Sequence, residues 1–386
     1  MPPSETAEVP AEARALLAAL AVQPRPAGSA AETRARARCA AWLRACGFDV
    51  RAERFTYSTL PGRWGTPAAG LAAGGAIVGA ALLGRGGAPG SALVLLTAAA
   101  VALAAAARWM ARRGVLALPA RATSENLVAE RPAHAGRTRV WLVAHLDSKS
   151  QPVPIALRAV GVIGTAAVWV VAAALALAQL AGVDARAVWP LVGVVGAVVA
   201  LPVALTVVGS ASDGAVDNAS GVAAVLEAAR RVAPAHAVGV LLTSAEELGL
   251  AGARAWAAHV PPAVALNCDG VDDAGPLVAM YSGRRPARLA DVLATVGEGR
   301  VHVRRLLPGV LTDGVALADA GWPVVTLSRG TRATLRRIHT RRDDLAHLAG
   351  DGLADAAEVL ARAATALAAP AGAAAPAAPA APARGA

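Results

Sequence analysis

Short apolar segments recur along the chain, and they constrain its fold more than any other feature. Segments 140–144, 237–243, 263–266 and 323–327 are apolar throughout rather than alternating, which is typical of strands covered on both faces. A helical pattern over 221–231 separates the first two segments. Because strands that alternate with helices form mainly parallel sheets, the sequence predicts an α/β fold.

Two extended segments depart from this alternation. Segments 124–130 and 138–144 are joined by the stretch Pro132-Ala133-His134-Ala135-Gly136. Proline and glycine punctuate turns, so these two segments are predicted to form an antiparallel hairpin added to the sheet.

Residues of metal-ligand type stand at or soon after the ends of the apolar segments, except Asp217, which opens the helical stretch. In chain order these residues are His145, Asp147, Asp217, Glu246, Glu247, Asp269 and His339. Open α/β sheets bind their ligands beyond the carboxyl ends of parallel strands. We therefore expect these side chains to meet at one edge of the sheet.

The residue types suit a hydrolase that uses two metal ions. One carboxylate can bridge two ions about 3.5–4 Å apart, and imidazoles and further carboxylates complete each shell, which suits zinc and, less strictly, cobalt or manganese. The adjacent Glu246 and Glu247 can divide metal binding and proton abstraction between them. Asp147 is placed to orient the imidazole of His145. Each motif alone is more often a helix cap, a turn or a surface residue, so the inference rests on their joint order.

In this order the motifs resemble the co-catalytic zinc aminopeptidase family, which includes bacterial leucyl aminopeptidase, glutamate carboxypeptidase and glutaminyl cyclase. The matching segments are 144–148, 217–222, 246–252, 267–269 and 339–343, with further matches at 25–29, 47–50 and 312–323. The resemblance implies a three-layer α/β/α domain with a mostly parallel mixed sheet. Gly314 departs from the family pattern, because many relatives carry a histidine after the aspartate that corresponds to Asp313. This departure leaves the wall of the substrate pocket undefined by the resemblance.

The resemblance also implies a role for each matching residue. The implied metal ligands are His145, Asp217 and Asp269 for one zinc ion and Asp217, Glu247 and His339 for the second, with Asp217 as the bridge. Glu246 is the implied general base, and Asp147 is the second catalytic residue. The implied activity is that of an aminopeptidase acting on peptides. A carboxypeptidase or glutaminyl-cyclase-like reaction on the same scaffold stays open, as does a catalytically silent membrane scaffold.

Long apolar stretches interrupt this domain. The chain is 56% hydrophobic, with a mean hydropathy of +0.49. Segments 159–181 and 187–208 carry no charged residue, and the short polar break between them contains Asp184 and Arg186. Segments 68–83 and 91–107 form an earlier, alanine- and glycine-rich pair. About 20 apolar residues cross a bilayer. Because each pair must return to the domain it leaves, the sequence predicts two transmembrane helical hairpins.

These expectations divide the chain into one discontinuous peptidase domain and its insertions. The domain occupies 1–64, 111–157 and 210–368, the transmembrane hairpins occupy 65–110 and 158–209, and a disordered Pro/Ala tail occupies 369–386.

Charge and cysteine usage indicate the surroundings of the chain. The net charge of +10 comes almost entirely from arginine, and Lys149 is the only lysine. No basic stripe is interleaved with aromatic residues, so we expect no nucleic-acid partner. The expected partners are a peptide substrate and the lipid bilayer. Three cysteines, no evident signal peptide, and basic residues near the domain-side ends of the spans predict a cytoplasmic domain at the inner membrane.

Overall fold

An eight-stranded mixed sheet forms the centre of the domain in this computed structural model, which describes residues 10–307 and 309–369. The strands are β1 (Asp49–Ser58), β2 (Arg121–Glu130), β3 (Val140–His145), β4 (Val238–Thr243), β5 (Val264–Val271), β6 (Leu277–Tyr281), β7 (Val301–Arg305) and β8 (Val324–Arg329). Their spatial order is β1-β2-β4-β3-β5-β8-β6-β7. Strands β4, β3, β5 and β8 are parallel neighbours, whereas β1–β2, β2–β4 and β6–β8 are antiparallel.

The four strands predicted from the apolar segments are confirmed as β3, β4, β5 and β8. The predicted hairpin between 124–130 and 138–144 is wrong, because β4 lies between β2 and β3. Residues 127–129 of β2 pair with 240–242 of β4, and the whole of β2 pairs with β1. A short turn on its own does not select the partner strand, and the fully apolar β4 is the better neighbour for β3.

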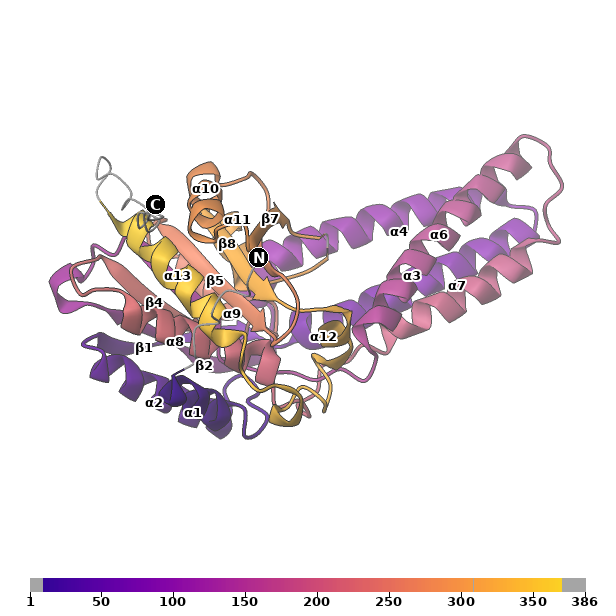
Figure 1. Ribbon diagram of the computed structural model, residues 1–386. Helices are drawn as coiled ribbons and strands as arrows, with labels where there is room; N and C mark the ends of the chain where they lie inside the picture. Colours follow the sequence, from indigo (N-terminus) through magenta and orange to yellow (C-terminus); the bar gives the residue numbers. More distant parts are fainter. Residues whose placement is uncertain (1–9, 308, 370–386) are drawn as a thin grey trace, which may run out of the picture.

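Helices cover both faces of the sheet (Figure 1). One face packs against α1 (Ala11–Leu20), α2 (Ala30–Ala45), α8 (Gly221–Arg231), α10 (Ala287–Val296) and α13 (Leu353–Ala368). The other face packs against α9 (Ala251–Ala257) and α11 (Asp313–Asp319). Successive residues of a strand point to opposite faces, so Leu142 joins the first core while Trp141 and Val143 join the second. The result is the expected three-layer α/β/α domain.

Four long apolar helices leave the domain together as one arm (Figure 1). They are α3 (Leu60–Arg85), α4 (Pro89–Trp109), α6 (Ile155–Leu180) and α7 (Trp189–Ala204). Each helix of the arm packs against at least two of the others, most extensively α3 against α7. Small residues allow close approach: a Cβ on Gly196 would lie 2.4 Å from Ile77 Cγ2, and one on Gly84 would lie 2.1 Å from the Trp189 ring.

Three of these helices, α3, α4 and α6, are long and apolar enough to cross a membrane. Helix α7 has 16 residues and is shorter than the predicted span 187–208. The chain after Ala204 leaves the helix because residues 205–209 approach the domain, where Gly209 pairs with Ser150. The predicted disordered tail lies, apart from Ala369, outside the described residues.

Both hairpins lie in connections at the same edge of the sheet. The first hairpin (α3–α4) leaves after β1 and returns into β2, whose residue Arg121 pairs with Ser58. The second (α6–α7) leaves after β3, and its two ends are joined by hydrogen bonds of 2.9 Å and 2.7 Å between the main chains of Ser150 and Gly209. Because β1 and β2 are antiparallel, as are β2 and β4, strand β1 runs in the same direction as β3. The arm therefore emerges from the edge at which the parallel strands end.

Candidate metal centre

The structure brings the five predicted metal ligands together at this carboxyl edge. His145 is the last residue of β3, and Glu247 follows β4. Asp217 lies in the irregular turn 215–220 that precedes α8, and His339 follows α12 (Arg332–Arg337) with a left-handed φ of 64°. Asp269 lies inside β5, at the irregularity between Cys268 and Val271, rather than beyond the strand end. This local break directs a carboxylate to the edge of the sheet.

The five side chains form two groups that share Asp217. In the first group, Nε2 of His145 lies 3.1 Å from Oδ1 of Asp217 and 3.5 Å from Oδ1 of Asp269. In the second, Nε2 of His339 lies 2.9 Å from Oδ2 of Asp217 and 3.5 Å from Oε1 of Glu247. Asp217 thus offers one oxygen to each group, the arrangement expected of a bridging carboxylate.

Buried hydrogen bonds hold Asp217 in this position. The main-chain N–H groups of Val216 and Asp217 donate to the carboxylate of Asp343 over 2.7 Å and 3.2 Å. The side chain of Asn218 donates to the carbonyl of Cys268 and accepts from the N–H of Gly270, which ties the turn to β5. The peptide bond between Asp217 and Asn218 is cis. The hydrogen bonds of Asn218 to β5 fix the shared residue relative to Asp269.

Asp147 links the first strand to the paired glutamates. Its carboxylate accepts hydrogen bonds from the N–H groups of Glu246 at 3.1 Å and Glu247 at 3.2 Å. Nδ1 of His145 lies 3.0 Å from the main-chain carbonyl of Asp147, but 3.7 Å from its carboxylate. The imidazole is therefore oriented by the carbonyl of Asp147, while the carboxylate orders the segment that carries Glu246 and Glu247.

A buried arginine, which the sequence marked only as part of a matching segment, fastens two loops beneath the centre. The guanidinium of Arg25 donates to the carbonyls of Leu146 and Gly214, at 3.0 Å and 2.9 Å. It thereby connects the loop after His145 with the turn that carries Asp217. Asp343 has a similar supporting role. Neither residue has metal-ligand spacing, and only their places in segments 25–29 and 339–343 could have singled them out.

The electrostatics of the cluster follow from the crowding of carboxylates around two imidazoles. Burial by itself would raise the pKa of Asp217, but the adjacent imidazoles of His145 and His339 hold it well below its usual range. Burial opposes charge on His145, yet Glu246 and the other facing carboxylates raise its pKa well above the usual value. Burial and the charge of Glu247 raise the pKa of Glu246. Glu246 and Glu247 therefore differ, because Lys149 overcomes burial and lowers the pKa of Glu247 to about 2.

These groups fit divalent metal ions. Nε2 of His145 and Oε1 of Glu247 are buried and have no hydrogen-bond partner among the described residues. Both atoms face the other members of their groups. The mixture of imidazole nitrogen and carboxylate oxygen suits zinc. A metal cation among these atoms would balance the charge of the carboxylates. In the metal-free cluster, protonated imidazoles, whose pKa values are raised, supply that positive charge.

Comparison with known proteins gives a consistent result. The model of Peptidase family M28 matches residues 198–364. The family resemblance is confirmed. The M28 match begins within α7 and includes Asp217, Glu246, Glu247, Asp269 and His339, whereas His145 lies before it. No curated protein matches the chain.

Solved structures resemble nearly the whole chain in fold. An aminopeptidase from Aneurinibacillus sp. strain AM-1 is 16% identical, with a TM-score of 0.51, over 91% of this chain and 92% of that one. The zinc aminopeptidase of Bacillus subtilis is 15% identical, with a TM-score of 0.52, over 91% and 93%. A glutaminyl cyclase from Tannerella forsythia is 15% identical, with a TM-score of 0.52, over 92% and 97%. These likenesses establish the fold alone.

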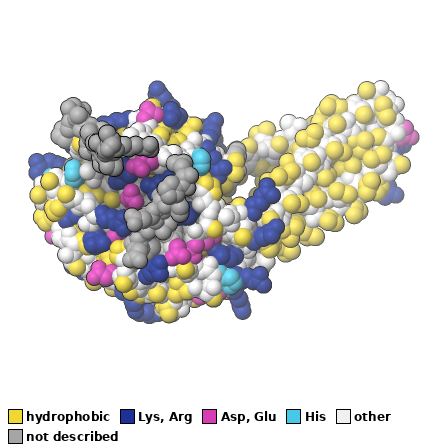
Figure 2. All heavy atoms as spheres, in the orientation of Figure 1, with side chains coloured by type: hydrophobic (Ala, Val, Ile, Leu, Met, Phe, Trp, Pro, Cys, Tyr) yellow, Lys and Arg dark blue, Asp and Glu magenta, His cyan; other side chains and the backbone are white. Residues whose placement is uncertain are grey.

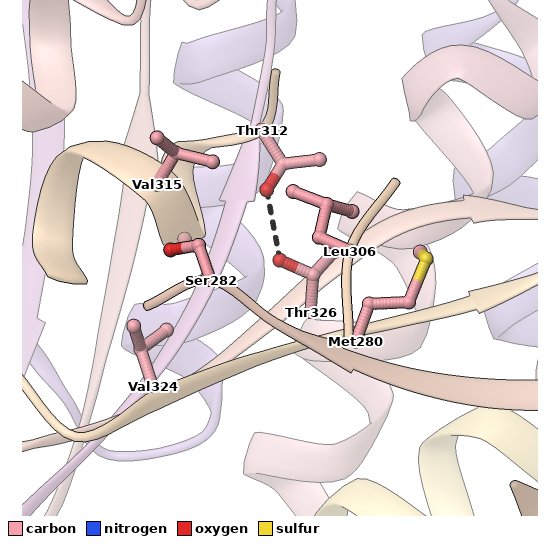
Figure 3. A pocket seen from close by; sticks show the side chains of 8 residues that line it. Met280, Ser282, Leu306, Thr312, Val315, Val324 and Thr326 are labelled. Atoms are coloured by element: carbon pink, nitrogen blue, oxygen red, sulfur yellow. Dashed lines mark hydrogen bonds between the residues drawn. The ribbon is translucent and has the colours of Figure 1, made fainter. Parts of the chain in front are cut away.

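Gly314 belongs to the lining of a small pocket (Figure 3), and the packing there explains its departure from the family pattern. Thr312 and Thr326 face each other across the pocket, joined by a hydrogen bond of 2.9 Å. A Cβ at position 314 would lie 2.5 Å from Oγ1 of Thr326, so a histidine there would require this pair to move. Asp313, the buried neighbour, accepts a hydrogen bond from Thr243, and burial raises its pKa to about 7.

Proposed function

We propose that this chain is a membrane-embedded, zinc-dependent exopeptidase of the aminopeptidase type, with two zinc ions. The observation that carries the proposal is the pair of ligand groups that share Asp217, with Glu246 beside them. One ion is assigned to His145 and Asp269, the other to Glu247 and His339, and Asp217 belongs to both. A catalytically silent scaffold would not need this complete set of ligands.

The residues then divide the work of peptide hydrolysis. Bound zinc supplies the Lewis acid that polarises a peptide carbonyl and acidifies a water molecule. Glu246 accepts the proton of the attacking water and can return it to the leaving amine, and its raised pKa suits both steps near neutral pH. The carboxylate of Asp147 keeps Glu246 in place by accepting a hydrogen bond from the main-chain N–H of Glu246. Glu247, with a pKa of about 2, is ionised and serves as a ligand.

We further propose that the arm spans a lipid bilayer as two hairpins, within the division 1–64, 65–110, 111–157, 158–209, 210–368 and 369–386. The face of the arm that Figure 2 shows is largely apolar, and the interior of the arm is an apolar cluster that includes Ile77, Leu96 and Trp189. Its exposed large side chains include Val94, Val101, Val160, Ile163, Val170, Leu191, Val194 and Val198. In a bilayer such a surface faces lipid, and small residues provide the helix–helix contacts. In water the same side chains would form a large exposed apolar surface, which soluble proteins rarely have.

The distribution of arginines supports a cytoplasmic domain at the inner membrane. Arg63, Arg108 and Arg158 lie in the arm helices near the domain, and Figure 2 shows basic side chains where the arm meets the domain. The far ends of the helices carry Arg85 and Arg186, with Asp184 beside the latter. Positively charged residues near span ends favour the cytoplasmic side.

A peptide panel tests the activity. The full chain, purified in lipid nanodiscs, is given peptides with a free amino terminus, the same peptides acetylated, and peptides beginning with glutamine. We expect zinc-dependent release of N-terminal residues from the free peptides alone. Cyclisation of the glutamine peptides, which the likeness to a glutaminyl cyclase makes the next candidate, would replace the aminopeptidase assignment. Turnover that persists in Glu246→Gln would exclude this centre as its source.

A further inference from the structure

The two ligand groups differ in what holds their histidines. The carbonyl of Asp147 can only accept, so Nδ1 of His145, 3.0 Å away, must donate to it. A neutral ring with its proton on Nδ1 keeps the lone pair on Nε2, the atom that faces Asp217 and Asp269. When neutral, His145 is therefore in the tautomer that a metal ion requires.

His339 has the opposite contact. A guanidinium nitrogen of Arg158 lies 3.4 Å from Nδ1 of His339. Arginine has only donors, so Nδ1 must accept, and a neutral ring then carries its proton on Nε2. That atom faces Asp217 and Glu247. The contact with Arg158 therefore opposes the tautomer through which His339 would coordinate a metal ion.

The carboxylate of the same group also has a cationic partner. The ammonium group of Lys149 forms an ion pair with Oε2 of Glu247, and only 17% of the Lys149 side chain is exposed. Oε1 of Glu247 stays free to face His339. Lys149 thus fixes which oxygen of Glu247 points into the group, and it places a positive charge beside the position of the second ion.

Both cationic residues belong to the base of the second hairpin. Lys149 precedes Ser150, whose main chain pairs with Gly209 where the hairpin closes. Arg158 lies in the first turn of α6. Among the described residues, neither His145 nor Asp269 forms an ion pair with a lysine or an arginine. The asymmetry between the two groups therefore follows from which group the base of the hairpin contacts.

We propose that Lys149 and Arg158 are positioning residues through which the base of the second hairpin sets the metal affinity of the group formed by Asp217, Glu247 and His339. The inference rests on the proposed metal centre. The first group fills at lower metal concentration, because its histidine is preset and no cation opposes the ion. The second group fills only when Arg158 leaves Nδ1 of His339 and the charge of Lys149 is overcome, so a shift of the hairpin base changes its occupancy.

Calorimetric titration with Zn²⁺ tests the proposal on the full chain in nanodiscs, after removal of metal with a chelator. We expect two binding phases in the wild type. Lys149→Gln keeps an amide donor for Glu247 but removes the charge, and it should tighten the second phase by at least about tenfold, with the first phase changed by less than about threefold. Arg158→Gln should tighten the second phase by about threefold or more.

Two matched variants separate this effect from a general change in charge. Lys149→Arg keeps the ion pair and should keep the weak second phase. Arg54→Gln removes one exposed charge from β1 and should leave both phases unaltered. If the second phase is unchanged or weaker in both Lys149→Gln and Arg158→Gln, the proposal fails. Two ions of equal affinity in the wild type would also refute it, yet leave the metal centre standing. Absence of zinc binding in the wild type would refute the metal centre itself.

Should Lys149→Gln misfold, its first phase would disappear as well, and Arg158→Gln then decides. A tighter second phase in Arg158→Gln supports the coupling to the hairpin base, and an unchanged one overturns it.

Discussion

The domain and the arm bury different kinds of groups. Around the metal centre the domain buries charged side chains, and each has specific partners: Arg25 donates to four main-chain carbonyls, and Asp343 accepts from two main-chain N–H groups. The arm instead packs glycine and alanine inside and exposes valine and leucine outside. Buried charge is costly unless it is paired, so the domain needs particular residues where the arm needs only size and apolarity.

The two regions nevertheless meet at the proposed metal centre. Both hairpins enter at the carboxyl edge of the sheet, and the second separates His145 from Asp217, although the two side chains lie 3.1 Å apart. A substitution in the domain should therefore act on metal and turnover, whereas one in the outer part of the arm should act on stability alone. The predictions that follow test this separation.

The largest effect is expected at the shared ligand. Asp217→Ala removes an oxygen from each ligand group, so zinc content should fall from about two ions to less than one and hydrolysis should fall to the background. His145→Ala should weaken mainly the first position. Metal analysis and peptide hydrolysis measure both variants. Normal turnover by Asp217→Ala after treatment with a strong chelator would sink the assignment.

The paired glutamates should separate chemistry from metal binding. Glu246→Gln removes the proton acceptor and keeps the ligands, so kcat should fall by about 10²–10⁴ at nearly constant zinc content. Glu247→Gln should instead lower zinc content, because its Oε1 faces His339. Parallel metal analysis and kinetics on the two variants decide between the roles, and the reverse pattern would exchange base and ligand.

A smaller effect is expected in the arm. A side chain at Gly196 would collide with Ile77, whereas a Cβ at Gly75 has no neighbouring atom within 4 Å. Gly196→Leu should destabilise the arm by about 1–3 kcal/mol, and Gly75→Leu is the matched control. Thermal unfolding in detergent measures the difference, and zinc affinity should be equal in both variants. Loss of zinc binding in Gly196→Leu would contradict the separation of arm and metal centre.

The same difference between the regions explains what the sequence could predict. The strands and the convergence of His145, Asp217 and His339 were readable, because ligand chemistry demands particular residue types at strand ends. The sequence did not predict that β2 pairs with β4. Strand pairing depends on which apolar strand packs best beside β2, and a turn that contains Pro and Gly does not specify the partner strand. The contacts of Lys149 and Arg158 were also hidden, because a single basic residue carries no spacing signal.

The smallest effect, none on activity, is expected from labels that test the orientation of the arm. In a Cys46→Ser background, where Cys39 and Cys268 are buried, Asp184→Cys places a thiol at the far end of the arm and Arg137→Cys places one on the domain. An impermeant maleimide applied to intact cells should label Asp184→Cys alone, because the arginines at the domain end favour the cytoplasm. Cell lysis should expose the Arg137→Cys thiol, which controls for its reactivity. Labelling of Arg137→Cys but not Asp184→Cys in intact cells would reverse the proposed orientation and place hydrolysis outside the cytoplasm.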